Sequence, residues 1–235
     1  MSDKHLSSQF DAALNLLSTW LLKIGGLVES QISAVLTLLS RFDRAVVLRV
    51  RDVERWLNQM EVEIDDEINN IIARRQPAAR DLRLLMATFK CVTNLEQAGD
   101  EAWKIAKRLQ KIDAACAATT MQIAELRNSG EMALTILHRS LDAFARMDVV
   151  AAAQIMRDNL AIDNRFRLFV QQLVADMNAA PGTISPCLDY LFIAKAIERI
   201  GDHATNIAEF VIYIVKGRDV RHLPLARLEE EILRS

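Results

Sequence analysis

Hydrophobic residues recur every three or four positions along most of the chain, the spacing that places them on one face of an α-helix. The first such run is Phe10, Leu14, Leu17, Leu21, Ile24, Val28, Ile32, Val35 and Leu39. A second run from Val46 to Ile71 keeps this period and ends before Gln76-Pro77, because the residue before a proline disfavours helical backbone. The pattern therefore predicts two long amphipathic helices joined by a turn at residues 41–43.

The rest of the chain repeats this alternation of long helical segments and short breaks. We expect helices over residues 81–111, 121–146, 149–177 and 185–216, and a short charged helix over 225–233. The breaks are a small polar stretch at 113–120, an Arg-Met-Asp turn at 146–148 that matches Arg-Phe-Asp at 41–43, and the segment 178–182. Gly217 follows the last long helix, a position where glycine is favourable.

This order of helices predicts an all-α fold made of two tandem three-helix bundles related by a pseudo-twofold axis, because short connections make consecutive helices antiparallel neighbours. The first bundle would span residues 1–114, the second residues 115–217, and a charged tail would span 218–235. Gly25 and Gly26 lie inside the first helix and weaken it by about 1 kcal/mol each relative to alanine. Their presence indicates close packing against a neighbouring helix.

An acidic motif occurs once in each predicted bundle, as Glu96-Gln-Ala-Gly-Asp100 and as Glu198-Arg-Ile-Gly-Asp202. Glu198, Asp202 and Asn206 lie within about 80° of one another on a helix that turns by 100° per residue. The apolar stripe of the same helix is centred well away from them, so we expect the acids on the outer face of the bundle. Gly201 lies between the two sides and leaves room for a bulky group to approach.

Two acids one turn apart repel each other by about 0.2–0.5 kcal/mol, so a cation should offset their charge. One candidate is intramolecular, with Lys195 pairing with Glu198 and Arg199 pairing with Asp202. The other is a metal ion, since carboxylate and amide oxygens suit Mg, Mn, Ca or an iron cluster. The spacing alone favours ordinary ion pairs, and the repetition of the motif favours a metal.

Composition and charge narrow the class of protein. A net charge of −2 argues against a general nucleic-acid binder. Cys91, Cys116 and Cys187 are widely spaced, which is typical of reduced, buried thiols in a cytoplasmic protein. The N-terminus lacks the pattern of a secretory signal, and no run approaches the ~20 apolar residues of a membrane helix. We therefore expect a soluble cytoplasmic protein.

The paired acidic motifs, together with Arg75-Gln-Pro-Ala-Ala-Arg-Asp-Leu-Arg83 and Leu141-Asp-Ala-Phe-Ala-Arg-Met-Asp148, resemble the PhoU family over residues 10–223. The resemblance implies a cytoplasmic regulator that holds the phosphate-starvation response off when phosphate is plentiful. It implies bridging between the ATPase subunit of a phosphate ABC transporter and a phosphate-sensing membrane histidine kinase. It also implies a homodimer that reaches the membrane through its partners alone and has no catalytic residues.

The resemblance further implies metal ligands on both motifs: Glu198, Asp202 and Asn206 in the second, and Glu96 and Asp100 in the first. Additional acidic ligands would come from the neighbouring helix of each bundle, at Glu54, Glu61 and Asp163. The implied cofactor is a divalent metal or an iron cluster, with Mg, Mn or Fe as the ion. Lys104 stands in the first motif where the second has asparagine, and it is placed to neutralise Asp100 directly.

Two other classes of function stay open. One is a metal-free helical scaffold whose acids are neutralised by Lys195, Arg199 and Lys104. The other is a di-metal carboxylate enzyme. Such enzymes place Glu-x-x-His motifs inward on paired helices, and this chain has no such motif, so the enzyme is disfavoured.

Overall fold

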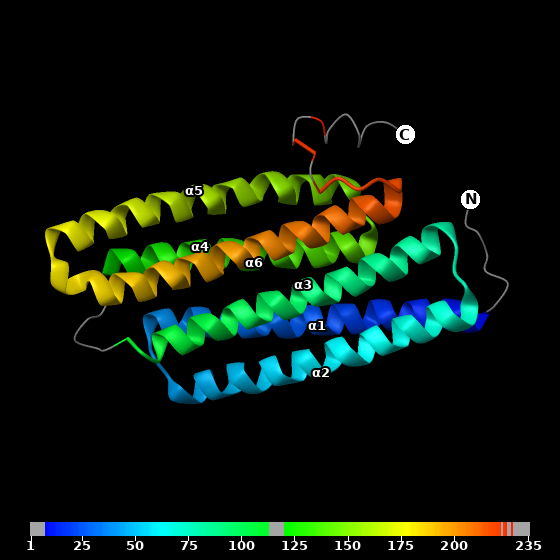
Figure 1. Cartoon of the computed structure of the whole chain (residues 1–235), viewed down its shortest axis with the longest axis horizontal. Coiled ribbons are helices and arrows are strands. Elements are labelled where there is room, and N and C mark those ends of the chain that lie inside the picture. The colour runs from blue at the N-terminus through cyan, green and yellow to red at the C-terminus, as the bar shows by residue number, and fades with distance from the viewer. Residues whose placement is uncertain (1–7, 113–119, 222, 225–226, 228–235) are drawn as a thin grey trace.

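The computed structural model describes residues 8–112, 120–221, 223–224 and 227 (Figure 1). These residues form α1 (Ser8–Ser40), α2 (Arg44–Arg75), α3 (Ala79–Leu109), α4 (Thr120–Arg146), α5 (Val149–Ala179) and α6 (Ile184–Lys216), with a 3₁₀ turn, η2 (Pro181–Thr183), before α6. The predicted all-α fold is confirmed, and each long helix begins and ends within a few residues of its predicted bounds. The expectations for the N-terminus, for residues 113–119 and for most of the helix at 225–233 lie outside the described residues.

The two matching Arg-x-Asp turns have the same function, which is to cap the following helix. Asp43 Oδ1 accepts a hydrogen bond from the backbone N–H of Ala45 at 2.8 Å. Asp148 Oδ1 accepts from the N–H groups of Val150 and Ala151 at 3.0 and 2.9 Å. Such caps satisfy backbone donors that have no partner at the start of a helix, and they typically contribute about 1 kcal/mol.

The six helices form two sets of three that pack side by side. Within the first set α1, α2 and α3 contact one another, and within the second set α4, α5 and α6 do the same. The sets meet where α3 packs along α6 and where α1 packs along α4, and the α3–α6 contact is the most extensive in the molecule. Figure 1 shows the result, with α3 and α6 adjacent at the centre and α2 and α5 on the outer sides.

Two glycines mark the contact between α1 and α4 and reveal the pseudo-twofold relation. A Cβ added to Gly25 would lie 2.5 Å from Leu141 Cδ1, and one added to Gly130 would lie 2.3 Å from Leu36 Cδ2. The two glycines are separated along the sequence by the same interval as the two leucines, so the contacts are equivalent under the exchange of repeats. The close packing predicted for Gly25 is thus confirmed, whereas Gly26 faces open space.

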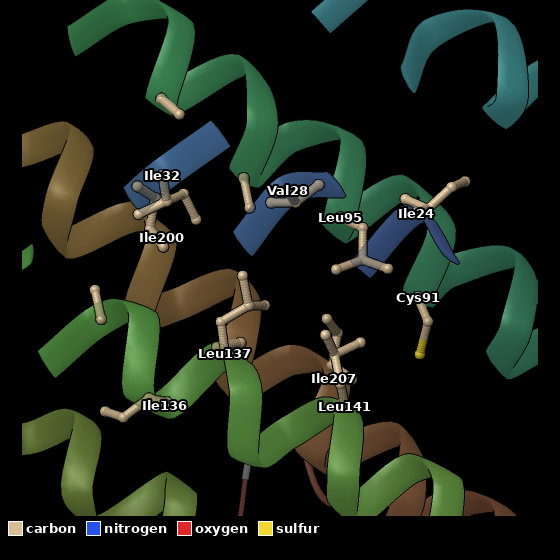
Figure 2. Close-up of a cluster of buried hydrophobic side chains, with 14 of the residues drawn as sticks. Ile24, Val28, Ile32, Cys91, Leu95, Ile136, Leu137, Leu141, Ile200 and Ile207 are labelled. Atoms are coloured by element: carbon tan, nitrogen blue, oxygen red, sulfur yellow. The ribbon is translucent and has the colours of Figure 1, made fainter. Parts of the chain in front are cut away.

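A single hydrophobic core runs through both sets of helices. Figure 2 shows Ile24, Val28 and Ile32 of α1 and Cys91 and Leu95 of α3 beside Leu137 and Leu141 of α4 and Ile200 and Ile207 of α6. By length and composition, α1 from Phe10 onward could also cross a membrane, but half of its most apolar segment is buried inside the protein. Its place in this core accounts for its apolar composition.

Candidate functional site

The first acidic motif lies along the contact between α2 and α3, and we call Glu54, Glu61, Glu96 and Asp100 the first seam. Burial raises the pKa of Glu96 to about 7, and repulsion from Glu61, Asp100 and Glu54 adds to the effect. The structure therefore brings the two α2 acids predicted from the sequence close to the motif on α3. At neutral pH this seam carries more negative charge than its surroundings accommodate.

An internal lysine partly neutralises the first seam. Lys104 Nζ lies 2.7 Å from Asp100 Oδ2 and 3.0 Å from Glu101 Oε1. The predicted contact between Lys104 and Asp100 is confirmed. Asp65, one turn after Glu61 on α2, has a raised pKa because of burial and of repulsion from Glu61, and its Oδ1 is buried without a hydrogen-bond partner.

The second acidic motif lies along the contact between α5 and α6, and we call Asp163, Glu198 and Asp202 the second seam. Burial raises the pKa of Asp202, and repulsion from Glu198 raises it further. Burial and the Glu198 charge likewise raise the pKa of Asp163, so the acid predicted on the neighbouring helix is in place. The predicted pair between Lys195 and Glu198 is confirmed.

The expectation that these acids lie on a solvated outer face is wrong. The side chain of Glu198 is 13% exposed, because α5 packs along the same side of α6 that carries the motif. A helical wheel gives the angle between the acids and the apolar stripe of their own helix, but it does not show where the next helix packs. The acids thus lie in grooves between helices, where repulsion is less screened than at the surface.

Asn159 on α5 is part of the second seam, and the sequence reasoning missed it. A Cβ added to Gly201 would lie 2.4 Å from Asn159 Oδ1, so the room left by this glycine is taken by the asparagine amide. Asn159 is 6% exposed, and its Nδ2 donates to Asp202 Oδ1 at 3.2 Å. Its Oδ1 and the Oδ1 of Asp163 are buried with no hydrogen-bond partner. Two oxygen atoms of this seam therefore lack a donor or a cation.

Arg199 does not pair with Asp202 as the sequence suggested. Its Nε lies 3.1 Å from Oε1 of Glu101 on α3. Glu101 is 3% exposed, and a buried carboxylate needs a cation more than the less buried Asp202 does. Sequence reasoning also missed Glu101, which follows Asp100 and was read as part of an ordinary helix.

Asn206 is likewise engaged by α3 rather than by the second seam. Its Nδ2 donates to Asn94 Oδ1 at 2.9 Å, and His203 Nδ1 lies 3.1 Å from the same oxygen. Burial lowers the pKa of His203 to about 4, so the ring is neutral at neutral pH. The structure therefore brings Glu198 and Asp202 to Asp163, and it places Asn206 in a polar contact between the repeats.

Each seam offers hard oxygen ligands that need positive charge, which is the chemistry of a divalent cation site. The unpaired oxygens of Asn159, Asp163 and Asp65 fit this requirement. As the side chains lie, however, no three His, Cys, Asp or Glu residues in the described part of the chain are placed to share one ion. The predicted metal ligands stay a prediction.

The raised pKa of Glu96 predicts a pH-dependent stability. Between about pH 4.5 and 7 the folded protein keeps a proton that the unfolded chain has released, so the free energy of unfolding falls as the pH rises through this window. Glu96→Gln should remove this contribution and should be more stable than the wild type at pH 8 by about 1 kcal/mol, after a discount for solvent screening.

Urea unfolding at pH 5, 6, 7 and 8 measures this effect. Glu209, whose pKa burial also raises to about 7, stays in the variant and sets its remaining pH dependence. Glu63→Gln, an exposed substitution on α2, is the control that should follow the wild type. Parallel pH profiles for Glu96→Gln and the wild type would contradict the prediction.

Comparison with known proteins agrees with this architecture. A family model described as the PhoU domain matches residues 21–109 and again residues 126–211. A Burkholderia protein named phosphate-specific transport system accessory protein PhoU homolog is 50% identical over 234 residues, which is 99% of this chain and 100% of the relative. The Escherichia coli K12 phosphate-specific transport system accessory protein PhoU is 40% identical over 222 residues, or 94% of this chain and 91% of that protein.

Solved structures share the fold. The crystal structure of PhoU from Pseudomonas aeruginosa matches with a TM-score of 0.85 at 38% identity, covering 89% of this chain and all of that one. The phosphate transport system regulatory protein PhoU from Streptococcus pneumoniae matches with a TM-score of 0.82 at 24% identity, covering 90% and 99% of the two chains. The doubled match and these relatives together show that the chain belongs to the PhoU family.

Proposed function

We propose that this protein is a non-enzymatic regulator of phosphate uptake that keeps the phosphate-starvation response off when phosphate is plentiful. The observation that carries the proposal is the 50% identity, over nearly the whole chain, with a protein named as an accessory protein of the phosphate-specific transport system. A role in the regulation of phosphate transport follows from membership of the family. The steps below concern how this chain would perform it.

The protein would act in the cytoplasm as an adaptor between the ATPase subunit of the phosphate transporter and a membrane histidine kinase. A shared core makes the six helices one body, and the pseudo-twofold relation gives that body two similar faces. Such a body holds two partners in a fixed relation without chemistry of its own. We expect it to work as a homodimer and to reach the membrane through these partners.

A bound divalent cation, with Mg, Mn or Fe as the ion, would supply the positive charge that the seams lack. Asp163, Glu198 and Asp202 would hold it in the second seam. Glu54, Glu61, Glu96 and Asp100 would hold it in the first. Asn159 orients Asp202 through its hydrogen bond, while Lys195 and Lys104 already neutralise one acid of each seam.

Deletion of the gene tests the regulatory role. The deletion strain should express phosphate-starvation genes in excess phosphate, and the wild-type gene should restore repression. Glu198→Gln with Asp202→Asn should restore it poorly, because the second seam then has no charge to engage a cation or partner. Glu131→Gln, on an exposed part of α4, is the matched control and should restore repression fully.

Reporter activity in high phosphate gives the readout, and pull-down of the transporter ATPase by the tagged protein gives a second one. Normal repression in the deletion strain would end the regulatory proposal. Full repression by the double variant would leave the regulatory role standing but would remove the second seam from it.

A metal-free scaffold is the second candidate, and the contacts of Lys104 and Lys195 with Asp100 and Glu198 favour it. Metal analysis after purification in manganese, magnesium or iron separates the two, since a scaffold would retain no ion. A di-metal enzyme would need its acids in a bundle core, whereas here they lie in grooves between helices. An oxidase assay on iron-loaded protein tests that third alternative.

A further inference from the structure

The ends of the α3–α6 contact form two related surfaces. Leu82, Met86 and Lys90 precede Glu96 by the same intervals at which Ile184, Leu188 and Phe192 precede Glu198. A cation–π pair occurs at each end with the partners exchanged. Lys90 Nζ lies 5.6 Å from the centroid of the Phe210 ring at one end, and Arg108 Cζ lies 4.2 Å from that of Phe192 at the other.

We name these surfaces by their residues. The first shelf consists of Met86, Lys90, Glu209, Phe210 and Tyr213. The second shelf consists of the residues at the equivalent sequence positions, which are Leu188, Phe192, Lys107, Arg108 and Lys111. In Figure 1 the C-terminal ends of α6 and α3, which contribute to the first and second shelf respectively, lie at opposite ends of the molecule.

The first shelf is covered by the chain itself. After α6 ends at Gly217, the chain turns back so that Val220 is 1% exposed, and Asp219 and Arg221 close a cavity of about 160 Å³ over the shelf. Hydrogen bonds from Arg221 lower the pKa of Asp219 to about 2, and the nearby Lys90 contributes in the same direction. The occupant of this shelf thus combines a buried aliphatic side chain with a carboxylate that faces a lysine.

The second shelf has the same apolar floor but is uncovered by described residues. Leu188 is 41% exposed and Phe192 is 49% exposed. Its rim is more basic than that of the first shelf, because Lys107, Arg108 and Lys111 replace Glu209, Phe210 and Tyr213. Of these cations, Arg108 contacts Asp189 at 2.8 Å. An occupant of this surface must therefore supply aliphatic side chains and several carboxylates.

The sequence of this protein contains a segment of that chemistry, Leu228-Glu-Glu-Glu-Ile-Leu233. We propose that this acidic segment of a second copy docks on the second shelf, with its aliphatic residues on Leu188 and Phe192 and its glutamates toward the basic rim. This contact does not depend on the phosphate role. It would give the homodimer of the proposed function a defined interface.

The distances require a second copy. Leu188 and Gly217 are separated along α6 by about 40 Å at 1.5 Å per residue. The chain from Pro224 to Leu228 spans at most about 14 Å when fully extended. Pro224 lies next to the first shelf, since Leu223 N–H donates to Val220 O at 3.0 Å. The segment of the same chain therefore falls well short of the second shelf.

Charge reversal on either side of the contact tests the proposal by sedimentation velocity of the full chain. Lys107→Glu with Lys111→Glu should weaken dimerisation at least tenfold, and so should Glu229→Lys with Glu230→Lys and Glu231→Lys. A mixture of the two variants should dimerise again, because each shelf then faces a tail of opposite charge. Arg49→Glu with Arg55→Glu, an equal charge change on exposed α2 residues, should leave the dimer intact.

A second measurement uses a labelled peptide of residues 225–235. It should bind the full chain, compete with dimerisation, and fail to bind the Lys107→Glu/Lys111→Glu variant. Circular dichroism verifies that each variant is folded. A wild-type monomer at all concentrations, a dimer insensitive to both reversals, or a mixture that stays monomeric would each overturn the proposal.

Discussion

Leu137→Ala is expected to lower the free energy of unfolding by about 2–5 kcal/mol and to destabilise both sets of helices together. Leu137 on α4 is fully buried and lies in the core shared with α1, α3 and α6 (Figure 2). Truncation of a leucine in such a place loses its transfer free energy and leaves a cavity that neighbours fill incompletely. Because the cavity borders both sets, neither set can unfold without exposing it.

The three tryptophans make this prediction sharp. Trp20, Trp56 and Trp103 all lie in the first set of helices, so their fluorescence reports the unfolding of a set that does not contain Leu137. Urea unfolding followed by fluorescence and by circular dichroism should give coincident transitions, both shifted in the variant. Leu168→Ala on exposed α5 is the control, with an effect within about 0.5 kcal/mol.

A fluorescence midpoint that stays at the wild-type value while circular dichroism shifts would contradict the prediction. The two repeats would then be independent domains, as the predicted ranges 1–114 and 115–217 on their own allow. The family match at 21–109 and 126–211 agrees with two repeats but says nothing of whether they unfold together.

The helices were predictable from the sequence because the information that fixes them is local. The apolar period of α1 and the Arg-x-Asp turns before α2 and α5 each concern residues within a few turns of one another. The shared core was not predictable in the same way. Gly25 indicated close packing, but that its neighbour is Leu141, more than a hundred residues away, depends on how the two sets meet.

The candidate site divides along the same line. The motif residues Glu96, Asp100, Glu198 and Asp202, and the local pair between Lys195 and Glu198, followed from sequence spacing. The contact of Arg199 with Glu101 joins two helices of different repeats, and no spacing within either helix reveals it. Asn159 escaped because the search considered acids, and the one signal for it was a glycine on the facing helix.

A divalent cation is expected to stabilise the folded protein by about 2.7 kcal/mol when its concentration is a hundred times the dissociation constant of one seam. The cation would offset the repulsion that raises the pKa values of Glu96 and Asp202. Protons compete for the same oxygens, so the stabilisation should grow as the pH rises through about 7, where Glu96 loses its proton. Thermal unfolding with manganese or magnesium, each against a chelator, measures it.

Variants assign the effect to one seam or the other. Glu96→Gln with Asp100→Asn should remove the contribution of the first seam, and Glu198→Gln with Asp202→Asn that of the second. Lys104→Asn, which gives the first motif the residue of the second, should tighten binding at the first seam because the competing ammonium group is gone. If neither metal shifts the unfolding temperature of any of these proteins, the internal lysines are sufficient counterions, and the metal-free scaffold becomes the better description of both seams.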